Sequence, residues 1–314
     1  MIILLVLMIV FAVLAGIGIY LNKSAFYTKT WEYQATFDNE VKKGFFDPDF
    51  YYQLKKEELY IGSTFGYPIH AIWIPMKASD KTVIMTHGYT YSLFGSVKYM
   101  NIFLQRGYNV LMYDHRYHGK SGGENCTMGF REKDDLKTVT DWVVHKKGEE
   151  SLIVTYGESL GGATVLLHGA MDNRVAAIIA DCPYKSVFDE FTYQLKKEYN
   201  LPAFPLIYIA DWFSPLFIQT RFSHISPIKA VKKIDCPVLF IHGDEDKYIP
   251  PHFSVDMYNQ KPGKKQLYLA KGADHAQSFI VDRGAYTAQI HDFLSEIETN
   301  TKNIPEPQKT TPLN

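Results

Sequence analysis

Short apolar runs alternate with amphipathic stretches through most of the chain. The runs with the length and composition of buried β-strands are residues 82–87, 109–114, 152–156, 175–181, 237–242 and 266–270. The stretches with apolar residues at helical spacing are residues 93–106, 132–147, 160–171 and 278–297. Because alternating strands and helices are joined by right-handed crossovers, this pattern predicts an α/β fold: a mostly parallel central sheet with helices on both faces.

Two regions interrupt the alternation. Before it begins, residues 59–66 and 67–75 have the pattern of paired strands around a turn near Gly66. Later, residues 184–230 are rich in aromatic side chains and are broken by prolines, and the strand pattern resumes only after them. An insertion between two strands of one sheet predicts a helical cap over the carboxyl edge of that sheet.

The first 21 residues contain no charged side chain. As a helix they would span about 30 Å, the thickness of the hydrocarbon core of a bilayer. The absence of a polar face argues against a buried core helix. A cleaved signal peptide is the alternative, because residues 13–15 (VLA) offer a cleavage site, but the segment has no basic start and stays apolar to Leu21. We therefore predict a retained transmembrane anchor over residues 1–21, followed by interfacial aromatic residues such as Trp31.

Basic residues lie on one side of this segment. No Lys or Arg precedes it, and the lysines that follow it are Lys23, Lys29, Lys42 and Lys43. The positive-inside rule therefore favours a single-pass protein of the cell membrane with its large domain in the cytoplasm.

The rest of the chain divides into three parts. Residues 22–50 form a predicted helical stalk, with a helix from Ala25 to Lys43 that packs on the domain. Residues 51–299 form the main domain, which includes the cap. Residues 300–314 are polar and contain proline, so we expect a disordered tail.

Composition and charge exclude several classes of protein. The chain has 314 residues, 46% of them hydrophobic, which is enough for one large core. The net charge of −1 leaves no basic stripe for a nucleic acid. Three cysteines (Cys126, Cys182 and Cys236) without ligand spacing suggest neither a disulfide framework nor a zinc site. Neither HExxH nor GxxxxGK[ST] occurs, so we expect no metal and no cofactor.

Residues 157–161 read Gly-Glu-Ser-Leu-Gly, which fits the pattern G-x-S-x-G. The pentapeptide lies between a predicted strand and a predicted helix, where a sharp turn would raise the hydroxyl of Ser159 above the sheet. The flanking glycines remove side chains that would collide at this turn. This context favours a nucleophilic serine over an ordinary turn.

A serine hydroxyl needs a base to activate it, and the base needs an acid to orient it. His275 follows the last predicted strand, and it is the candidate base. Asp244, Glu245 and Asp246 all follow the preceding strand. The order serine, acid, histidine is the one that this kind of elbow requires. The pattern alone leaves the choice among the three acids open.

An acyl-transfer transition state also needs hydrogen-bond donors for the oxyanion. The backbone N–H of Leu160, directly after the serine, is one candidate. The second should come from the loop after the strand at 82–87, and the N–H of Tyr89 is best placed there. Gly88 would allow the backbone to approach the substrate.

Five segments in this order resemble the α/β-hydrolase superfamily over about residues 55–298. They are His87-Gly88, the segment from Asp114 to Gly123, the elbow at 157–161, HGDEDKYIP at 242–250 and GADH at 272–275. The chain is most similar to the Bem46-like branch and related membrane-anchored bacterial hydrolases. The resemblance implies an α/β-hydrolase fold with a Ser-Asp-His triad.

The resemblance also bears on individual residues. In such proteins the acid lies in a G-x-x-D-x-x-[VI]-P pattern, which Gly243, Asp246, Ile249 and Pro250 match, and this singles out Asp246. The segment from Asp114 to Gly123 is usually a structural turn. This chain departs from the family there, because Tyr117-His118 replaces a glycine-containing pair. His115 and His118 lack a carboxylate partner at ligand spacing, so we interpret them as loop residues and not as a metal site.

These residues predict a serine hydrolase of esters or thioesters (EC 3.1) that works through an acyl-enzyme. The aromatic cap suggests an apolar acyl group, and a neighbouring bilayer suggests a lipid-like ester; a cap that packs only on itself is the alternative. A serine peptidase would use the same triad. A non-catalytic, membrane-tethered binding protein on this fold is a further alternative, although such proteins tend to lose triad residues.

Overall fold

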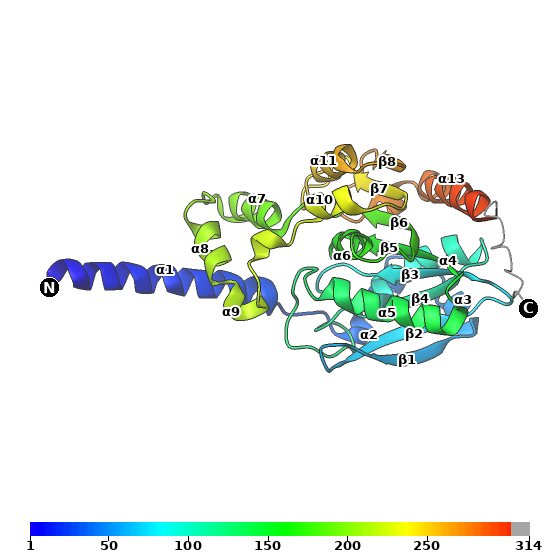
Figure 1. Ribbon diagram of the computed structural model, residues 1–314, viewed down its shortest axis with the longest axis horizontal. Coiled ribbons are helices and arrows are strands. Elements are labelled where there is room, and N and C mark those ends of the chain that lie inside the picture. Colours follow the sequence, from blue (N-terminus) through cyan, green and yellow to red (C-terminus); the bar gives the residue numbers. More distant parts are fainter. Residues whose placement is uncertain (303–314) are drawn as a thin grey trace, which may run out of the picture.

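A computed structural model describes residues 1–302, with side chains up to residue 299 (Figure 1). From residue 303 onward, the predicted tail lies outside the described residues. An eight-stranded sheet in the order β1-β2-β4-β3-β5-β6-β7-β8 forms the centre of the molecule. The strands are β1 (Glu57–Gly62), β2 (Pro68–Ile74), β3 (Lys81–Thr86), β4 (Asn109–Tyr113), β5 (Leu152–Glu158), β6 (Val175–Asp181), β7 (Val238–Gly243) and β8 (Lys265–Ala270).

The sheet is mostly parallel, as the alternation of elements predicts. Strands β3 to β8 run parallel to one another. The first two strands form an antiparallel pair, and β2 joins the sheet antiparallel to β4. The turn between β1 and β2 contains Gly66 at φ +84°, in the left-handed region that glycine adopts without strain. The predicted pairing around Gly66 is therefore confirmed.

Helices cover both faces of the sheet (Figure 1). The α-helices are α1 (Ile2–Phe26), α2 (Tyr33–Lys42), α3 (Pro48–Gln53), α4 (Val97–Leu104), α5 (Glu132–Lys147), α6 (Leu160–Gly169), α7 (Val187–Tyr199), α8 (Leu206–Phe213), α9 (Pro215–Ile218), α10 (Pro227–Ala230), α11 (His252–Gln260), α12 (Ser278–Val281) and α13 (Arg283–Lys302). Short 3₁₀ turns lie at Leu93–Ser96, Phe222–His224 and Val231–Lys233.

Alternating side chains along the strands divide the core into two layers. Val83 and Met85 of β3 face the layer that contains α4 and α13. Ile84, between them, faces the layer that contains α5, α6 and α11. The alternation follows from the two-residue period of a strand. Both faces are apolar because a parallel sheet is covered on each side.

The region after α1 corrects one prediction. A continuous helix from Ala25 to Lys43 was expected, but α1 ends at Phe26 and α2 begins only at Tyr33. Tertiary hydrogen bonds hold the chain open at this break: the N–H of Trp31 donates to Thr90 O at 2.8 Å, and Phe26 O accepts from the N–H of Cys126 at 2.9 Å. Local periodicity contains no signal for such long-range contacts.

Residues 22–50 pack closely on the domain. Phe37 of α2 is 5% exposed and belongs to the core layer that contains α4. The next helix, α3, begins inside the predicted stalk and continues into the predicted main domain, and its Tyr51 belongs to the same layer. The boundary predicted at residue 51 therefore falls within a helix.

The insertion between β6 and β7 forms a helical cap built from α7, α8, α9 and α10 (Figure 1). It has its own small core, which includes Val187, Leu195 and Phe222 and also takes in Phe26 from α1. Helix α1 runs alongside α8 and α9 before it extends beyond the rest of the molecule. Helix α1 and the cap thus meet on the side of the domain that contains the carboxyl edge of the sheet.

Candidate active site

Ser159 lies on a strained turn between β5 and α6. Its backbone has φ +57° and ψ −115°, which a residue other than glycine rarely adopts. The turn is tight because Gly157 and Gly161 touch the surrounding backbone: a Cβ on Gly157 would lie 2.2 Å from Gly161 O, and one on Gly161 would lie 2.3 Å from Thr86 O. The two glycines therefore permit the conformation that presents Ser159 at the edge of the sheet.

The structure brings Ser159, His275 and Asp246 together from three distant segments. His275 Nε2 lies 3.1 Å from Ser159 Oγ, and His275 Nδ1 lies 2.7 Å from Asp246 Oδ2. Because the carboxylate can only accept, Nδ1 carries a proton and donates it, which leaves Nε2 to accept from the serine hydroxyl. This is the geometry in which an imidazole can remove the proton of a serine.

The three neighbouring acids have different surroundings. Asp246 is 5% exposed, and its Oδ1 accepts from the N–H groups of Tyr248 and Ile249, each at 2.8 Å. Asp244 is exposed and accepts from the N–H of Gly272 at 2.6 Å, which ties down the neighbouring loop. Glu245 is also exposed. Only Asp246, of these three, contacts the imidazole of His275.

Burial and charge act against each other in this group. Burial alone would raise the pKa of Asp246, but hydrogen bonds from His242 and His275 outweigh it and hold that pKa below its usual range. For His275, burial favours the neutral ring, but the hydrogen bond and the charge of Asp246 raise the pKa above its ordinary value. Asp246 therefore stays ionised, and it stabilises the imidazolium that a base must form.

Two backbone N–H groups near Ser159, those of Leu160 and Tyr89, stay the candidates for an oxyanion site. Leu160 is the first residue of α6, so its N–H has no acceptor within the helix. Tyr89 lines the cavities on both sides of Ser159. Gly88 lies so close that a Cβ on it would be 3.6 Å from Ser159 Cβ. The two N–H groups form a candidate oxyanion site.

His118 supports the loop that contains Tyr89, a role that the sequence analysis missed. It is fully buried, and its Nε2 accepts from the N–H of Thr90 at 3.1 Å while its Nδ1 donates to Arg116 O at 2.8 Å. Burial lowers its pKa, so the ring stays neutral and can accept. Tyr117 has φ +67°, which explains why glycine is more usual at this point of the turn.

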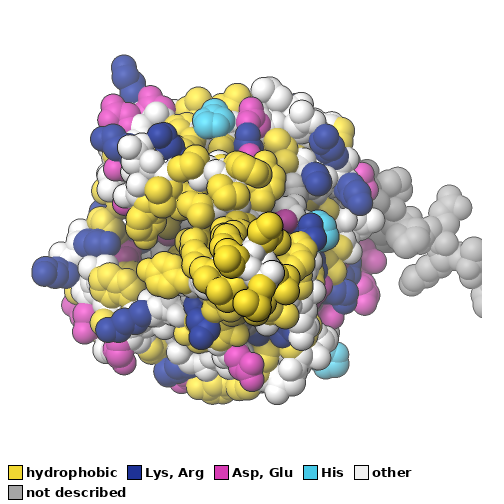
Figure 2. Space-filling model, turned by 90° about the vertical axis from the view of Figure 1, so that its left-hand side faces the viewer, with side chains coloured by type: hydrophobic (Ala, Val, Ile, Leu, Met, Phe, Trp, Pro, Cys, Tyr) yellow, Lys and Arg dark blue, Asp and Glu magenta, His cyan; other side chains and the backbone are white. Residues whose placement is uncertain are grey.

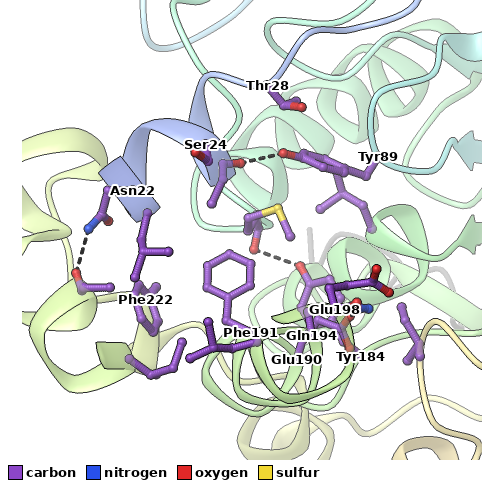
Figure 3. Close-up of a pocket in the computed structure, with 18 of the residues that line it drawn as sticks. Asn22, Ser24, Thr28, Tyr89, Tyr184, Glu190, Phe191, Gln194, Glu198 and Phe222 are labelled. Carbon is purple, nitrogen blue, oxygen red and sulfur yellow. Dashed lines mark hydrogen bonds between the residues drawn. The ribbon is translucent and has the colours of Figure 1, made fainter. Parts of the chain in front are cut away.

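Two cavities flank Ser159, and they differ in character. The first, of about 330 Å³, is mostly apolar and lies between α1 and the cap. In Figure 3, Asn22 and Ser24 come from α1 on one side, and Phe191 and Phe222 come from the cap. The second, of about 500 Å³, contains more polar groups; Lys98, Glu158 and His275 line it. Ser159 lines both cavities.

A network of buried charges lies beside Ser159. Glu158 Oε2 contacts Lys98 Nζ at 2.9 Å and also accepts from the hydroxyl of Tyr99. Burial disfavours the charge of Lys98, but Glu158 and Glu40 raise its pKa and keep it protonated. Asp181, below the elbow, accepts from the hydroxyl of Tyr286 at 2.7 Å. The sequence analysis missed these residues, although a lysine in the apolar helix VKYMNIFL was a signal.

Within the described part of the chain, potential metal ligands cluster only at the proposed triad. Cys182, Asp246 and His275 each place one donor atom within 4.8 Å of the others. Asp246 and His275 already hydrogen-bond each other, and burial raises the pKa of Cys182 well above its usual value, which favours the thiol over the metal-binding thiolate. His115 is buried with neither ring nitrogen bonded, and its pKa is lowered to about 3 by burial. Its ring neighbours are His87, Tyr113 and His118, and among the described residues no group of three potential metal ligands includes it.

Comparison with known proteins places the chain in a family. A family model described as "Serine aminopeptidase, S33" matches residues 77–227. The chain is 39% identical to the protein YqkD of Bacillus subtilis over 252 residues, which cover 80% of this chain and 83% of YqkD. The chain therefore belongs to the α/β-hydrolase superfamily, in the branch that includes YqkD.

Other relatives agree with this assignment. The protein bem46 of Schizosaccharomyces pombe is 29% identical and aligns with 62% of this chain and 60% of its own length. The lysophosphatidylserine lipase ABHD12 of Gallus gallus is 25% identical, over 67% of this chain and 58% of the lipase. Among solved structures, the esterase Pf2001 of Pyrococcus furiosus superposes with a TM-score of 0.65 at 26% identity, covering 80% of this chain and 94% of the esterase. The resemblance to the Bem46-like branch is thus confirmed.

Proposed function

We propose that this protein is a serine hydrolase that cleaves carboxylic esters or thioesters with an apolar acyl group. The observation that carries the proposal is the series of hydrogen bonds from Ser159 Oγ through His275 to Asp246, placed between an apolar and a polar cavity. Membership in the α/β-hydrolase superfamily and the likeness to an esterase support a hydrolytic reaction.

The proposed reaction has two halves. Ser159 Oγ attacks the carbonyl carbon while His275 Nε2 takes its proton, and the N–H groups of Leu160 and Tyr89 donate to the oxyanion. The imidazolium, stabilised by Asp246, then gives the proton to the departing alcohol or thiol. Water, activated by the same imidazole, releases the acid from the acyl-enzyme and restores the serine.

The two cavities suggest how the ester lies. His275 must reach the leaving group to protonate it, and His275 lines the polar cavity but not the apolar one. We therefore place the alcohol or thiol in the polar cavity and the acyl chain in the cavity between α1 and the cap. The name of the lysophosphatidylserine lipase, a relative that acts on a lipid ester, is consistent with this division.

The test is the hydrolysis of p-nitrophenyl esters from acetate to palmitate by the full chain and by Ser159→Ala. We expect kcat/KM to rise with acyl length until the apolar cavity is filled, and Ser159→Ala to lose at least about 10⁴-fold. A matched variant, Ala25→Phe, narrows the same cavity from the α1 side and should lower kcat/KM for long esters about 10- to 100-fold while acetate is unaffected. Activity that survives Ser159→Ala would refute the proposal.

A second candidate function is aminopeptidase activity. The description of the matching family model favours it, and so does Glu190, an acid in the apolar cavity whose Oε2 has no hydrogen-bond partner. An aminopeptidase needs such an acid to hold the ammonium group of its substrate. Turnover of aminoacyl-p-nitroanilides faster than of any p-nitrophenyl ester would replace the esterase proposal with this one.

We also propose that α1 anchors the enzyme in a membrane. Among the described residues, α1 is the helix long and apolar enough to cross a bilayer. The cytoplasmic position of the domain stays a prediction from the lysines that follow α1. Protease digestion of the domain on intact cells, and not only after lysis, would contradict it.

A further inference from the structure

Helix α1 is too short to cross a bilayer by itself before it meets the cap. Residues 2–13 are all exposed, and Leu14 and Ala15 are the first residues of the helix that the rest of the molecule partly covers. At about 1.5 Å per residue, the free segment is roughly 18 Å long, whereas the hydrocarbon core of a bilayer is about 30 Å thick. The apolar sequence reaches that length only if it includes residues up to Leu21, which lie beside the cap.

Contacts between α1 and the cap fix this arrangement. Gly18 packs so closely on α8 that a Cβ would lie 2.7 Å from the ring of Phe213. Asn22 is buried, and its side-chain amide donates to Ala210 O of α8 at 2.8 Å. The ring of Tyr27 meets the ring of Phe217 edge-on at 6.3 Å. The second half of α1 therefore cannot enter lipid without the part of the cap that it contacts.

The cap exposes large apolar side chains around this contact. We define the cap apolar face as the exposed residues Tyr199, Leu201, Phe204, Tyr208, Trp212 and Leu216. Phe204 and Leu216 are each 74% exposed. Residues 201–219 contain a single charged side chain, Asp211, which is 7% exposed and bonded to Ser223. Such a cluster of exposed apolar residues marks an interaction surface.

The position of this face points to lipid as its partner. In the view along α1, apolar side chains gather around the helix and over the neighbouring cap, while most charged side chains lie toward the rim (Figure 2). A surface that is continuous with a membrane-length apolar helix meets the same medium as that helix. Tyr and Trp side chains, such as Tyr208 and Trp212, are typical of the boundary between lipid and water.

We propose that the cap apolar face docks into the bilayer, so that α1 and the cap enter the lipid together. Immersion of the cap supplies the missing depth, because lipid can then cover α1 from Ile2 to about Leu21. The apolar cavity beside Ser159 is lined by α1 and α8, through residues such as Leu21, Ala25 and Ile207. If the proposed esterase function holds, an acyl chain can pass from the bilayer to the nucleophile between elements that are already in contact with lipid.

The test is the quenching of tryptophan emission by lipid. The full chain is reconstituted in phosphatidylcholine vesicles, with or without bromine at carbons 6 and 7 of one acyl chain. Matched variants each lose one tryptophan: Trp212→Phe on the cap, and Trp142→Phe on α5, which packs against the sheet. We expect bromine to quench the full chain, the quenched fraction to fall by more than half in Trp212→Phe, and no such fall in Trp142→Phe.

Two results would overturn the proposal. One is equal quenching by bromine in the full chain and in Trp212→Phe. The other is quenching by aqueous iodide in vesicles that falls in Trp212→Phe, which would place the cap in water. Equal quenching by bromine together with a concentration-dependent dimer in solution would place the cap apolar face against a second copy of the chain. The measurement needs no catalysis, so a failure of the esterase proposal would leave it interpretable.

Discussion

The sheet side and the cap side of Ser159 differ in which kind of side chain they bury and which kind they expose. On the sheet side, charged groups are buried and paired, as Lys98 is with Glu158 and His275 with Asp246. On the cap side, large apolar groups such as Phe204 and Leu216 face outward. Buried pairs hold a catalytic geometry in place, because each partner is needed to offset the desolvation of the other. A cluster of exposed apolar side chains buries little of its surface in the fold and indicates a partner. If the proposed function holds, the sheet side performs the chemistry and the cap side delivers the substrate.

The largest effect is expected on the sheet side, from Asp246→Asn. An amide in place of this carboxylate can hold His275 in the wrong tautomer, so kcat should fall about 10⁴-fold. Asp244→Asn is the matched control: Asp244 is exposed and binds only a loop N–H, so its rate should stay within a fewfold of the parent. Steady-state kinetics on one soluble ester compares the two. Equal losses in both variants would mean that the choice of Asp246 is wrong.

The same variant should move the pH profile. His275 must be neutral to act as a base, and Asp246 raises its pKa, so activity is lost as the pH falls through that raised pKa. In Asp246→Asn the interaction of Asp246 that raises the pKa of His275 is lost, while burial of the ring still lowers this pKa. The acidic limb of kcat/KM should therefore shift to lower pH even though the maximum falls. An acidic limb at the same pH in both proteins would show that a group other than His275 controls it.

A smaller but clear effect is expected on stability from Lys98→Met. The substitution leaves Glu158 buried without its cation, and breaking such a pair costs about 3–5 kcal/mol in the free energy of unfolding. The control is Lys137→Met, which removes an exposed i,i+4 pair with Asp141 and should cost less than about 1 kcal/mol. Urea unfolding of both variants gives the difference. Similar midpoints would mean that the buried network is not what holds the sheet side together.

The smallest effect is expected on the cap side, from Glu190→Gln. Burial raises the pKa of Glu190 to about 7, so this acid is mostly neutral below that pH and gains a charge above it. A charge in the acyl cavity disfavours an apolar chain, so KM for long esters should rise severalfold as the pH passes upward through 7. In Glu190→Gln this rise should disappear. If KM depends on pH in the same way in both proteins, the charge of Glu190 does not affect the binding of the acyl chain.

Much of the sheet could be predicted from local pattern. The helix Glu132–Lys147 and the strand Val175–Asp181 have the bounds that periodicity indicates, and the elbow lies where a strand gives way to a helix. Helix α11 was missed, since His252–Gln260 has only a few apolar positions to mark a buried face. The packing of α1 on α8 joins segments about 190 residues apart, as the bond from Asn22 to Ala210 (a separation of 188) illustrates.

The residues of the candidate site also fall into two groups: those that local sequence patterns predict and those that only the fold brings together. Ser159 and His275 follow from motifs at strand ends, and Asp246 follows from the family pattern. The support that His118 gives to the Tyr89 loop depends on a contact 28 residues apart in sequence, which no motif encodes. The pairing of Lys98 with Glu158 is equally non-local. Motifs thus indicate the proposed reacting groups, whereas the residues that hold these groups in place can be found only from the fold.

The central claim is that Ser159 is the nucleophile and that His275 activates it. The most direct measurement is the mass of the full chain after reaction with a fluorophosphonate, followed by location of the adduct by peptide mapping. The account predicts one adduct, on Ser159, that is absent in Ser159→Ala and forms far more slowly in His275→Ala. An adduct on another residue, or labelling that is equally fast without the imidazole, would contradict it.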